Sequence, residues 1–191
     1  MTTLDHVLSD LADESRRVDE WVSVLTPAQW ETVTTAEGWT VAHQIAHLHW
    51  TDATSVTAIT SSEAFDRLLV EATADPTGYV DAQSEAMATT PVADLLVAWR
   101  AGRAELDEAL RGVPDGEKIA WFGPPMSPAS MATARIMETW AHGHDIAEAL
   151  GLPFESTARD RHVCHIGVRA RGFAYLVHGE RDPGVDIRGR S

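Results

Sequence analysis

The sequence predicts an all-α protein, a bundle of four or five helices joined by short connections. Apolar residues recur every three or four positions along most of the 191 residues, which is the spacing of one face of a helix. Glycine, proline and capping residues separate these stretches, whereas the alternation typical of β-strands is scarce. The sequence has no internal repeat or low-complexity tract, so we expect one helical domain over residues 1–178 and a tail over residues 179–191.

Two helices are expected near the N-terminus. Residues 4–25 carry an amphipathic pattern of leucine, valine and tryptophan that predicts one long helix. Thr26 and Gln29 then have the spacing of a capping box, and Pro27 occupies the first helical position. A short helix that carries Trp30 should therefore follow.

A second long helix is expected over about residues 41–61, with Thr40 as its N-cap. The aliphatic stripe of this helix consists of Val41, Ile45, Leu48, Val56 and Ile59. The segment after it is predicted to be less regular, because Asp75, Pro76 and Gly78 interrupt the pattern.

Three more helices are expected in the C-terminal half. They cover about residues 91–112, 128–150 and 157–177, where apolar residues again follow helical spacing. Glycine and proline punctuate residues 116–128, which predicts a loop before the fourth long helix. The final stretch GVDIRGRS, residues 184–191, has the pattern of the start of a strand.

Composition excludes several classes of function. Fifteen basic against 29 acidic residues give a net charge of −14, which argues against binding to nucleic acid or to anionic membranes. No stretch approaches the length and apolar character of a membrane span, and the acidic N-terminus is unlike a signal peptide. The single cysteine, Cys164, forbids a disulfide within the chain, and we expect a cytoplasmic protein.

Two helical stretches gather residues that bind metals. The stretch AHQIAHLHW places His43 and His47 one turn apart, and the stretch METWAHGHD places Glu138 and His142 one turn apart. One carboxylate and two imidazoles suit zinc or another divalent first-row ion, and three protein ligands leave an open coordination position. His49 and His144 lie close by in the sequence.

The competing interpretation is an exposed Glu–His ion pair on a polar helix face. By helical phase, these residues lie away from the aliphatic stripes of their helices. Their companions on that second face are nevertheless small or apolar, among them Ala46, Trp50 and Met131. Such companions fit helices that are buried on two sides, but periodicity alone does not choose between the two interpretations.

The two stretches resemble a known family. Residues GWTVAHQIAHL (38–48) and RIMETWAHGHDIAEALG (135–151) are similar to motifs of the DinB-like superfamily. More narrowly, they resemble the metal-binding domain of mycothiol-dependent maleylpyruvate isomerases. The resemblance implies a DinB-like four-helix bundle with additional short helices, and it covers most of the chain in the order of its elements.

The resemblance also implies a site. The family's metal ligands fall on His47, Glu138 and His142. His43 matches a position near the site that does not bind the metal, and Asp145 matches an acidic position that orients a ligand imidazole through its other ring nitrogen. The expected ion is zinc, with nickel or another first-row ion as the alternative, and mycothiol or a similar thiol is the expected cosubstrate.

The activity implied by the resemblance is isomerisation of a small electrophile, or its conjugation, by the thiol. Two alternatives stay open: a non-catalytic module that holds a metal or a small apolar ligand, and a structural bundle without metal. Fuller family members carry a further small domain after the bundle, so residues 179–191 could be the entry into a domain that this sequence does not include. Homodimerisation is compatible with such bundles.

Three other residues have a structural interpretation that we prefer to a functional one. Trp39, in the turn before the second long helix, is expected to anchor packing rather than to line a cleft. Arg135, one turn before Glu138, is expected to be exposed, although it could bind the glutamate or a substrate carboxylate. Cys164 is expected to be buried and inert.

Overall fold

The computed structural model describes residues 2–177, 179 and 181. All regular structure in these residues is helical, apart from two isolated bridges, between Val33 and Thr40 and between Ile119 and Met126. The helices are α1 (Thr3–Val22), α2 (Pro27–Trp30), α3 (Val41–Thr60), α4 (Ser62–Ala74), α5 (Tyr79–Ala88), α6 (Val92–Gly112), α7 (Pro128–Leu150) and α8 (Asp160–Val177). The predicted all-α fold is therefore confirmed.

Local sequence sets the ends of the long helices. Thr2 and Asp5 form a capping box at the start of α1, in which each side chain bonds the backbone N–H of the other residue. Ser127 caps α7 and Pro128 takes its first position. Gly151 ends α7 with a positive φ of 64°, a conformation that costs glycine little because it lacks a Cβ atom.

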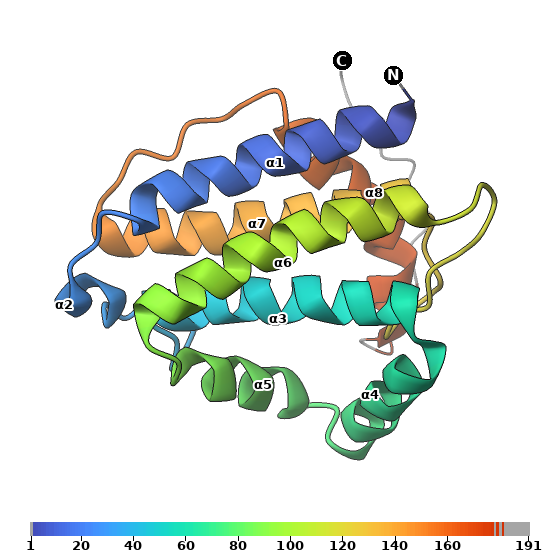
Figure 1. Cartoon of the computed structure of the whole chain (residues 1–191), viewed down its shortest axis with the longest axis horizontal. Helices are drawn as coiled ribbons and strands as arrows, with labels where there is room; N and C mark the ends of the chain where they lie inside the picture. The colour runs from blue at the N-terminus through green and yellow to red at the C-terminus, as the bar shows by residue number, and fades with distance from the viewer. Residues whose placement is uncertain (1, 178, 180, 182–191) are drawn as a thin grey trace.

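Helices α1, α3, α6 and α7 form the bundle, and the other helices cover it (Figure 1). Helix α1 packs on α7, and α6 packs on α3, while α3 and α7 face each other in the interior. Helices α4 and α5 lie against α3 on the side away from α1 and α7, and α8 packs on α7. As a result, α3 is enclosed by neighbours, and most of its residues are buried.

Buried apolar residues form two clusters along the bundle. One contains Trp30, Ile45, Trp99 and Ile146, and the other contains Leu106, Leu110, Met131 and Ile136. Burying a large aliphatic or aromatic side chain stabilises a fold by roughly 1.5–3 kcal/mol, so these clusters hold α3 and α7 in fixed register. That register brings polar residues of the two helices together.

The structure corrects one prediction about the elements. The segment after α3, predicted to be less regular, forms two well-defined helices, α4 and α5. Asp75, Pro76 and Gly78 do interrupt the helical structure, but they lie in the turn between the two helices. Asp75 stabilises that turn by accepting a hydrogen bond from the Gly78 N–H. The strand predicted at residues 184–191 lies outside the described residues.

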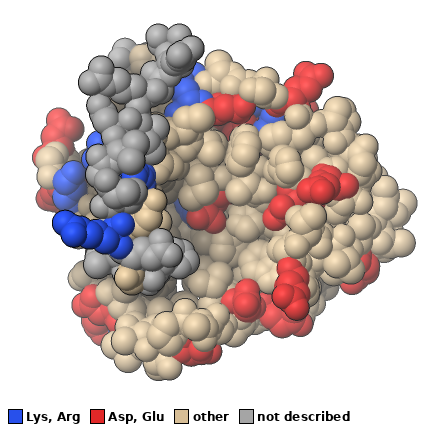
Figure 2. Space-filling model, turned by 180° about the vertical axis from the view of Figure 1, so that it is seen from behind, with Lys and Arg blue, Asp and Glu red and all other residues tan. Residues whose placement is uncertain are grey.

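Helix α8 forms where a fifth long helix is expected, but Cys164 is exposed rather than buried. The reason is that α8 packs on the bundle through one face only, and Cys164 lies on the other face. Among the described residues, no helix combines the length and the apolar composition needed to cross a bilayer. Acidic side chains are spread widely over the face shown in Figure 2, as the net charge of −14 leads us to expect.

Candidate metal centre

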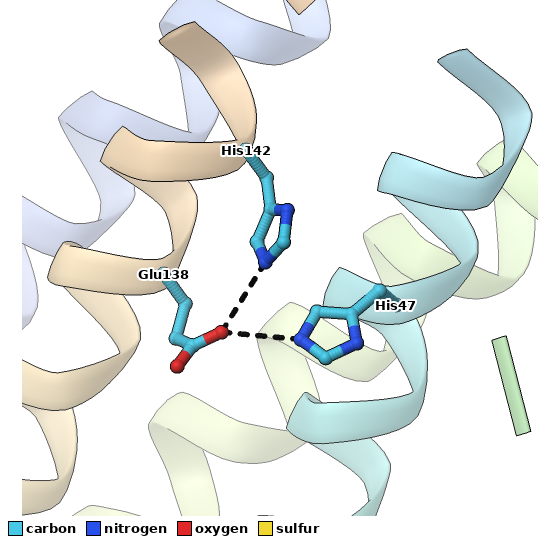
Figure 3. Close-up of side chains that lie close together, drawn as sticks. All are labelled: His47, Glu138 and His142. Carbon is cyan, nitrogen blue, oxygen red and sulfur yellow. Dashed lines mark hydrogen bonds and ion pairs between the residues drawn. The ribbon is translucent and has the colours of Figure 1, made fainter. Parts of the chain in front are cut away.

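Three side chains from α3 and α7 converge on one point (Figure 3). The Nε2 atom of His47 lies 3.1 Å from Oε2 of Glu138, and the Nε2 atom of His142 lies 3.4 Å from the same oxygen. One potential ligand atom from each residue lies within 4.8 Å of the other two. The structure thus brings together the three residues that the resemblance assigns as ligands, one from α3 and two from α7.

The three side chains differ in exposure. The side chain of His47 is 9% exposed, that of His142 is 17% exposed, and that of Glu138 is 26% exposed. The site is therefore sheltered, and Glu138 is its most exposed member. This arrangement differs from the exposed ion pair that was the competing interpretation of the sequence.

A hydrogen-bond chain fixes the ring orientation of His142. Gln44, fully buried on α3, donates from its Nε2 to Thr34 Oγ1 at 2.8 Å and to Asp145 Oδ2 at 3.4 Å. Both amide hydrogens are used, so the amide oxygen faces His142 Nδ1, with which it is hydrogen-bonded. The imidazole must donate this bond, so in the neutral ring the free lone pair is on Nε2, which points into the site.

The same logic applies to His47. Its Nδ1 atom lies 3.3 Å from Oγ of Ser84, a buried residue of α5. The Ser84 hydroxyl already donates to the carbonyl oxygen of Val80 at 3.0 Å, so the serine oxygen accepts from the imidazole. In the neutral imidazole of His47, Nε2 is therefore also the atom without a proton, and it faces Glu138.

These tautomers make the donor set suitable for a cation. Burial lowers the pKa of His47 and favours its neutral form. Burial would raise the pKa of Glu138, but the hydrogen bonds that His142 and His47 donate when they carry a proton on Nε2, together with the charge of Arg135, hold it well below its usual value. Without those protons, the two imidazole lone pairs and the carboxylate oxygen repel one another unless a positive ion lies between them, and such donors are the usual ligands of zinc.

Arg135 is buried, which contradicts the predicted exposure. It is 3% exposed, and its Nη2 atom lies 3.6 Å from Oε1 of Glu138, the oxygen that does not face the histidines. Its guanidinium group also lies over the ring of Trp121, 5.9 Å from the centroid. Because Arg135 is one turn before Glu138, it shares the inward second face of α7 and cannot reach solvent from there.

Trp39 also departs from its predicted role. Its ring stacks on His142 with 5.8 Å between centroids and lies 5.2 Å from the ring of His47. The tryptophan therefore lines the site, in addition to anchoring the turn before α3. Trp50 contacts His47 from another side, with 5.8 Å between ring centroids, so aromatic rings enclose much of the imidazole.

The two residues that the resemblance places beside the ligands, Asp145 and His43, make no direct contact with the ligand imidazoles. Asp145 does not touch a ligand imidazole: it accepts from Thr35 at 2.8 Å and reaches His142 only through Gln44. His43 lies outside the group of three, where its Nε2 bonds Glu85 at 2.6 Å.

The direct partners of the two imidazoles, Gln44 and Ser84, were not predicted. Gln44 is three residues before His47 on the same helix face, and a polar residue in an apolar stretch is a usable signal. Ser84 offered no such signal, because it belongs to a helix that was not predicted. His49 and His144 stay outside the group: His49 faces Gly102 of α6, and His144 is exposed beside Trp140.

Comparisons with known proteins point to one family. The family model described as mycothiol maleylpyruvate isomerase N-terminal domain matches residues 11–147. Two relatives, both uncharacterized proteins of Mycobacterium tuberculosis from the strains CDC 1551 / Oshkosh and ATCC 25618 / H37Rv, are 48% identical over 188 residues. The match covers 96% of this chain and 73% of each relative.

Solved structures show the same fold at low sequence identity. The crystal structure of a mycothiol-dependent maleylpyruvate isomerase superposes with a TM-score of 0.71 at 16% identity, and a histidine-to-alanine mutant of that enzyme superposes with a TM-score of 0.71 at 15% identity. Each match covers 95% of this chain and 77% of the solved chain. At this level of identity the structural likeness establishes the fold.

Proposed function

Because the chain belongs to the mycothiol maleylpyruvate isomerase N-terminal domain family, we propose that it is a metal-dependent enzyme that uses mycothiol or a similar thiol. Its substrate would be a small electrophile. The thiol either adds to the electrophile reversibly and so isomerises it, or stays attached to it as a conjugate. The observation that carries this proposal is the donor set of His47, Glu138 and His142, in which both imidazoles bond a buried polar group through Nδ1 and present Nε2 to the site.

These three residues would hold a divalent ion, with zinc as our first choice. Nickel or another first-row ion would accept the same nitrogen and oxygen donors. A bound ion of this kind stabilises a thiolate over a thiol and so supplies a nucleophile near neutral pH. Three protein ligands leave coordination positions for other groups, which is typical of catalytic rather than structural sites.

The surrounding residues would orient and shelter this centre. Gln44 and Ser84 keep the imidazoles in the tautomer that binds a cation, while Arg135 engages the glutamate oxygen that faces away from the histidines. The ring of Trp39 excludes water from one side of the site. Glu138 is the most exposed of the three ligands, so we expect thiol and electrophile to enter beside it.

The reaction also suggests a compartment. A thiol cosubstrate must stay reduced to act as a nucleophile, and the chain has a single cysteine, which is typical of proteins in a reducing environment. We therefore place this activity in the cytoplasm.

Metal content and thiol consumption test the proposal together. The protein is purified without a histidine tag and examined by elemental analysis, and thiol loss is followed with a panel of unsaturated electrophiles. We expect about one metal ion per chain and thiol consumption that chelation abolishes. The His47→Ala variant serves as the control that should lack both.

Other outcomes would replace the proposal. Stoichiometric metal without thiol consumption would favour the non-catalytic binding module. Protein that contains no metal and takes up none on addition of zinc or nickel would favour a structural bundle. Thiol consumption that is unchanged in His47→Ala would exclude this centre as the site of the reaction.

A further inference from the structure

A second feature lies on another side of α3 from His47. Helix α1 packs on α7 and α6 packs on α3, and the middle parts of α1 and α6 line a cavity of about 330 Å³ that is partly open to solvent. Both helices lie on the near side of the molecule in Figure 1. Asp52 contributes to this cavity from α3. It follows His47 by five residues, which is about 140° around a helix, so the cavity and the metal centre occupy different faces.

Asp52 is an unusual residue for such a position. It is 7% exposed, and within the described residues its carboxylate makes no hydrogen bond and no ion pair. A buried carboxylate without a partner is costly and is uncommon in the interior of proteins. This carboxylate therefore has an unmet requirement for a positive or hydrogen-bond-donating group.

The other charged groups of the cavity already form ion pairs, although the buried Nε atom of Arg103 has no hydrogen-bond partner among the described residues. Asp19 of α1 closes one end by pairing with Arg100 and Arg103 of α6. At the other end Asp107 pairs with Arg111, and Arg16 at the rim pairs with Asp13. Asp52 is thus the one charged group lining the cavity that forms no ion pair within the described part of the chain.

The remaining walls are apolar except for Ser15 of α1. Leu8 and Leu11 of α1 face Leu106 of α6, and Ala12 and Ala104 leave space between the helices. A volume near 330 Å³ lies within the range of sites for small organic ligands, which are typically lined by apolar residues with a few polar groups. A metal ion would bind weakly here, because hard cations take six or more oxygen ligands and Asp52 offers a single unpaired carboxylate.

We propose that the α1–α6 cavity binds a small organic cation. Its ammonium group pairs with Asp52, and its short apolar body packs against Leu8, Leu11 and Leu106. An anionic ligand is disfavoured, because the arginines at the cavity are paired with Asp19 and Asp13, and because the whole molecule carries a net charge of −14. This site does not depend on the proposed enzymatic function.

The test uses n-butylammonium and two counterparts of similar shape, n-butanol, which is uncharged, and butyrate, which is anionic. Binding is measured by calorimetry at about pH 8, where Asp52 is ionised. Wild-type protein should bind n-butylammonium roughly 10- to 100-fold more tightly than n-butanol, since a charged hydrogen bond contributes about 1.5–3 kcal/mol. Equal binding of the ammonium and the alcohol would overturn the proposal.

Two variants and a matched control locate the site. Asp52→Asn removes the charge while keeping the shape, and Leu11→Trp fills the cavity while keeping Asp52, so each should lose roughly tenfold or more in affinity for n-butylammonium. Asp107→Asn removes a carboxylate from the same cavity that is already paired with Arg111, and it should stay within about twofold of wild type. Wild-type affinity in Asp52→Asn, with the fold verified by circular dichroism, would exclude the site.

One further variant separates this proposal from the function of the metal centre. His47→Ala, which removes a proposed metal ligand, should bind n-butylammonium as wild type does, because the cavity is on another face of α3. Loss of n-butylammonium binding in a folded His47→Ala protein, with Asp52→Asn unaffected, would place the cation at the metal centre and overturn the assignment.

Discussion

The Nε2 atom of His47 on α3 lies 3.1 Å from Oε2 of Glu138 on α7, although 91 residues separate the two in the chain. Neither helix alone holds the three donors, so the site exists only when the bundle is folded. The tautomers of the two histidines are set by Gln44 and Ser84, which belong to the bundle as well. Metal affinity, stability and fold should therefore depend on one another, and each dependence can be measured.

The first prediction concerns the ligands. His47→Ala, Glu138→Ala and His142→Ala should each lose most of the bound metal, because two remaining ligands rarely hold a divalent ion in competition with water. Metal content of the purified variants, measured by elemental analysis after exposure to zinc and gel filtration, provides the test. Stoichiometric metal in both the Glu138 and His142 variants would refute the assignment.

Two neighbouring histidines are the controls for this experiment. His49→Ala and His144→Ala should retain the metal, since His49 faces Gly102 and His144 is exposed beside Trp140. Loss of metal in His144→Ala together with retention in His142→Ala would mean that the other histidine of the HGH sequence is the ligand.

The second prediction concerns the residue behind His142. Gln44→Met keeps the approximate shape of the side chain but removes the acceptor for His142 Nδ1. We expect zinc affinity to fall by about 10- to 100-fold, as is usual when the partner of a ligand imidazole is lost. Competition with a chromogenic chelator measures the change.

Asp145→Asn provides a graded comparison with Gln44→Met. Asp145 reaches His142 only through Gln44, at 3.4 Å from its amide nitrogen, so its loss should lower zinc affinity less than Gln44→Met does. Thr35→Ala, which removes only the other partner of Asp145, should have the smallest effect. A larger loss in Asp145→Asn than in Gln44→Met would show that the carboxylate, rather than the amide, sets the tautomer.

Most of the helices could be predicted from the sequence. The periodic stretches around Leu8, Ile45, Leu106 and Ile136 correspond to α1, α3, α6 and α7, because the apolar face of a helix must be buried whatever its neighbours are. Helices α4 and α5 were not predicted, because breakers such as Pro76 interrupt the apolar pattern although they occupy only the turn between the two helices.

The site was only partly predictable, and for a physical reason. Glu138 and His142 share a helix, so their proximity follows from spacing, but their approach to His47 depends on how α3 and α7 are rotated against each other. Periodicity does not specify that rotation for helices buried on two sides, and the resemblance supplied the pairing. The burial of Arg135 and the contact of Ser84 with His47 depend on the same tertiary packing.

The third prediction concerns metal and thermal stability. An ion that binds only the folded state stabilises it by RT ln(1 + [L]/Kd), about 2.7 kcal/mol at a hundredfold excess over Kd. For a domain of this size, such a gain should raise the melting temperature by roughly 5–10 °C. Scanning calorimetry with added zinc and with chelator measures the shift. His142→Ala should show no shift at the same zinc concentration, and an equal shift in that variant would indicate binding elsewhere.

The fourth prediction concerns Asp52 and pH in the absence of ligands. Burial raises the pKa of Asp52 from 3.8 to about 6, and the nearby charges of Arg135 and Arg103 offset only part of this effect. A raised pKa means that the folded state holds the proton more tightly, so the contribution of Asp52 to stability is most favourable below about pH 4 and is lost as the pH rises through 6. Above pH 6 the ionised, buried carboxylate should cost roughly 2–3 kcal/mol of folding stability.

Asp52→Asn keeps the shape of the side chain without its charge. At about pH 8 this variant should therefore be more stable than wild type by up to that amount, and at about pH 4 the two proteins should be nearly equally stable. Urea unfolding of both proteins at the two pH values measures the difference in the free energy of unfolding. A variant less stable than wild type at the higher pH would show that the Asp52 carboxylate has a stabilising partner when ionised.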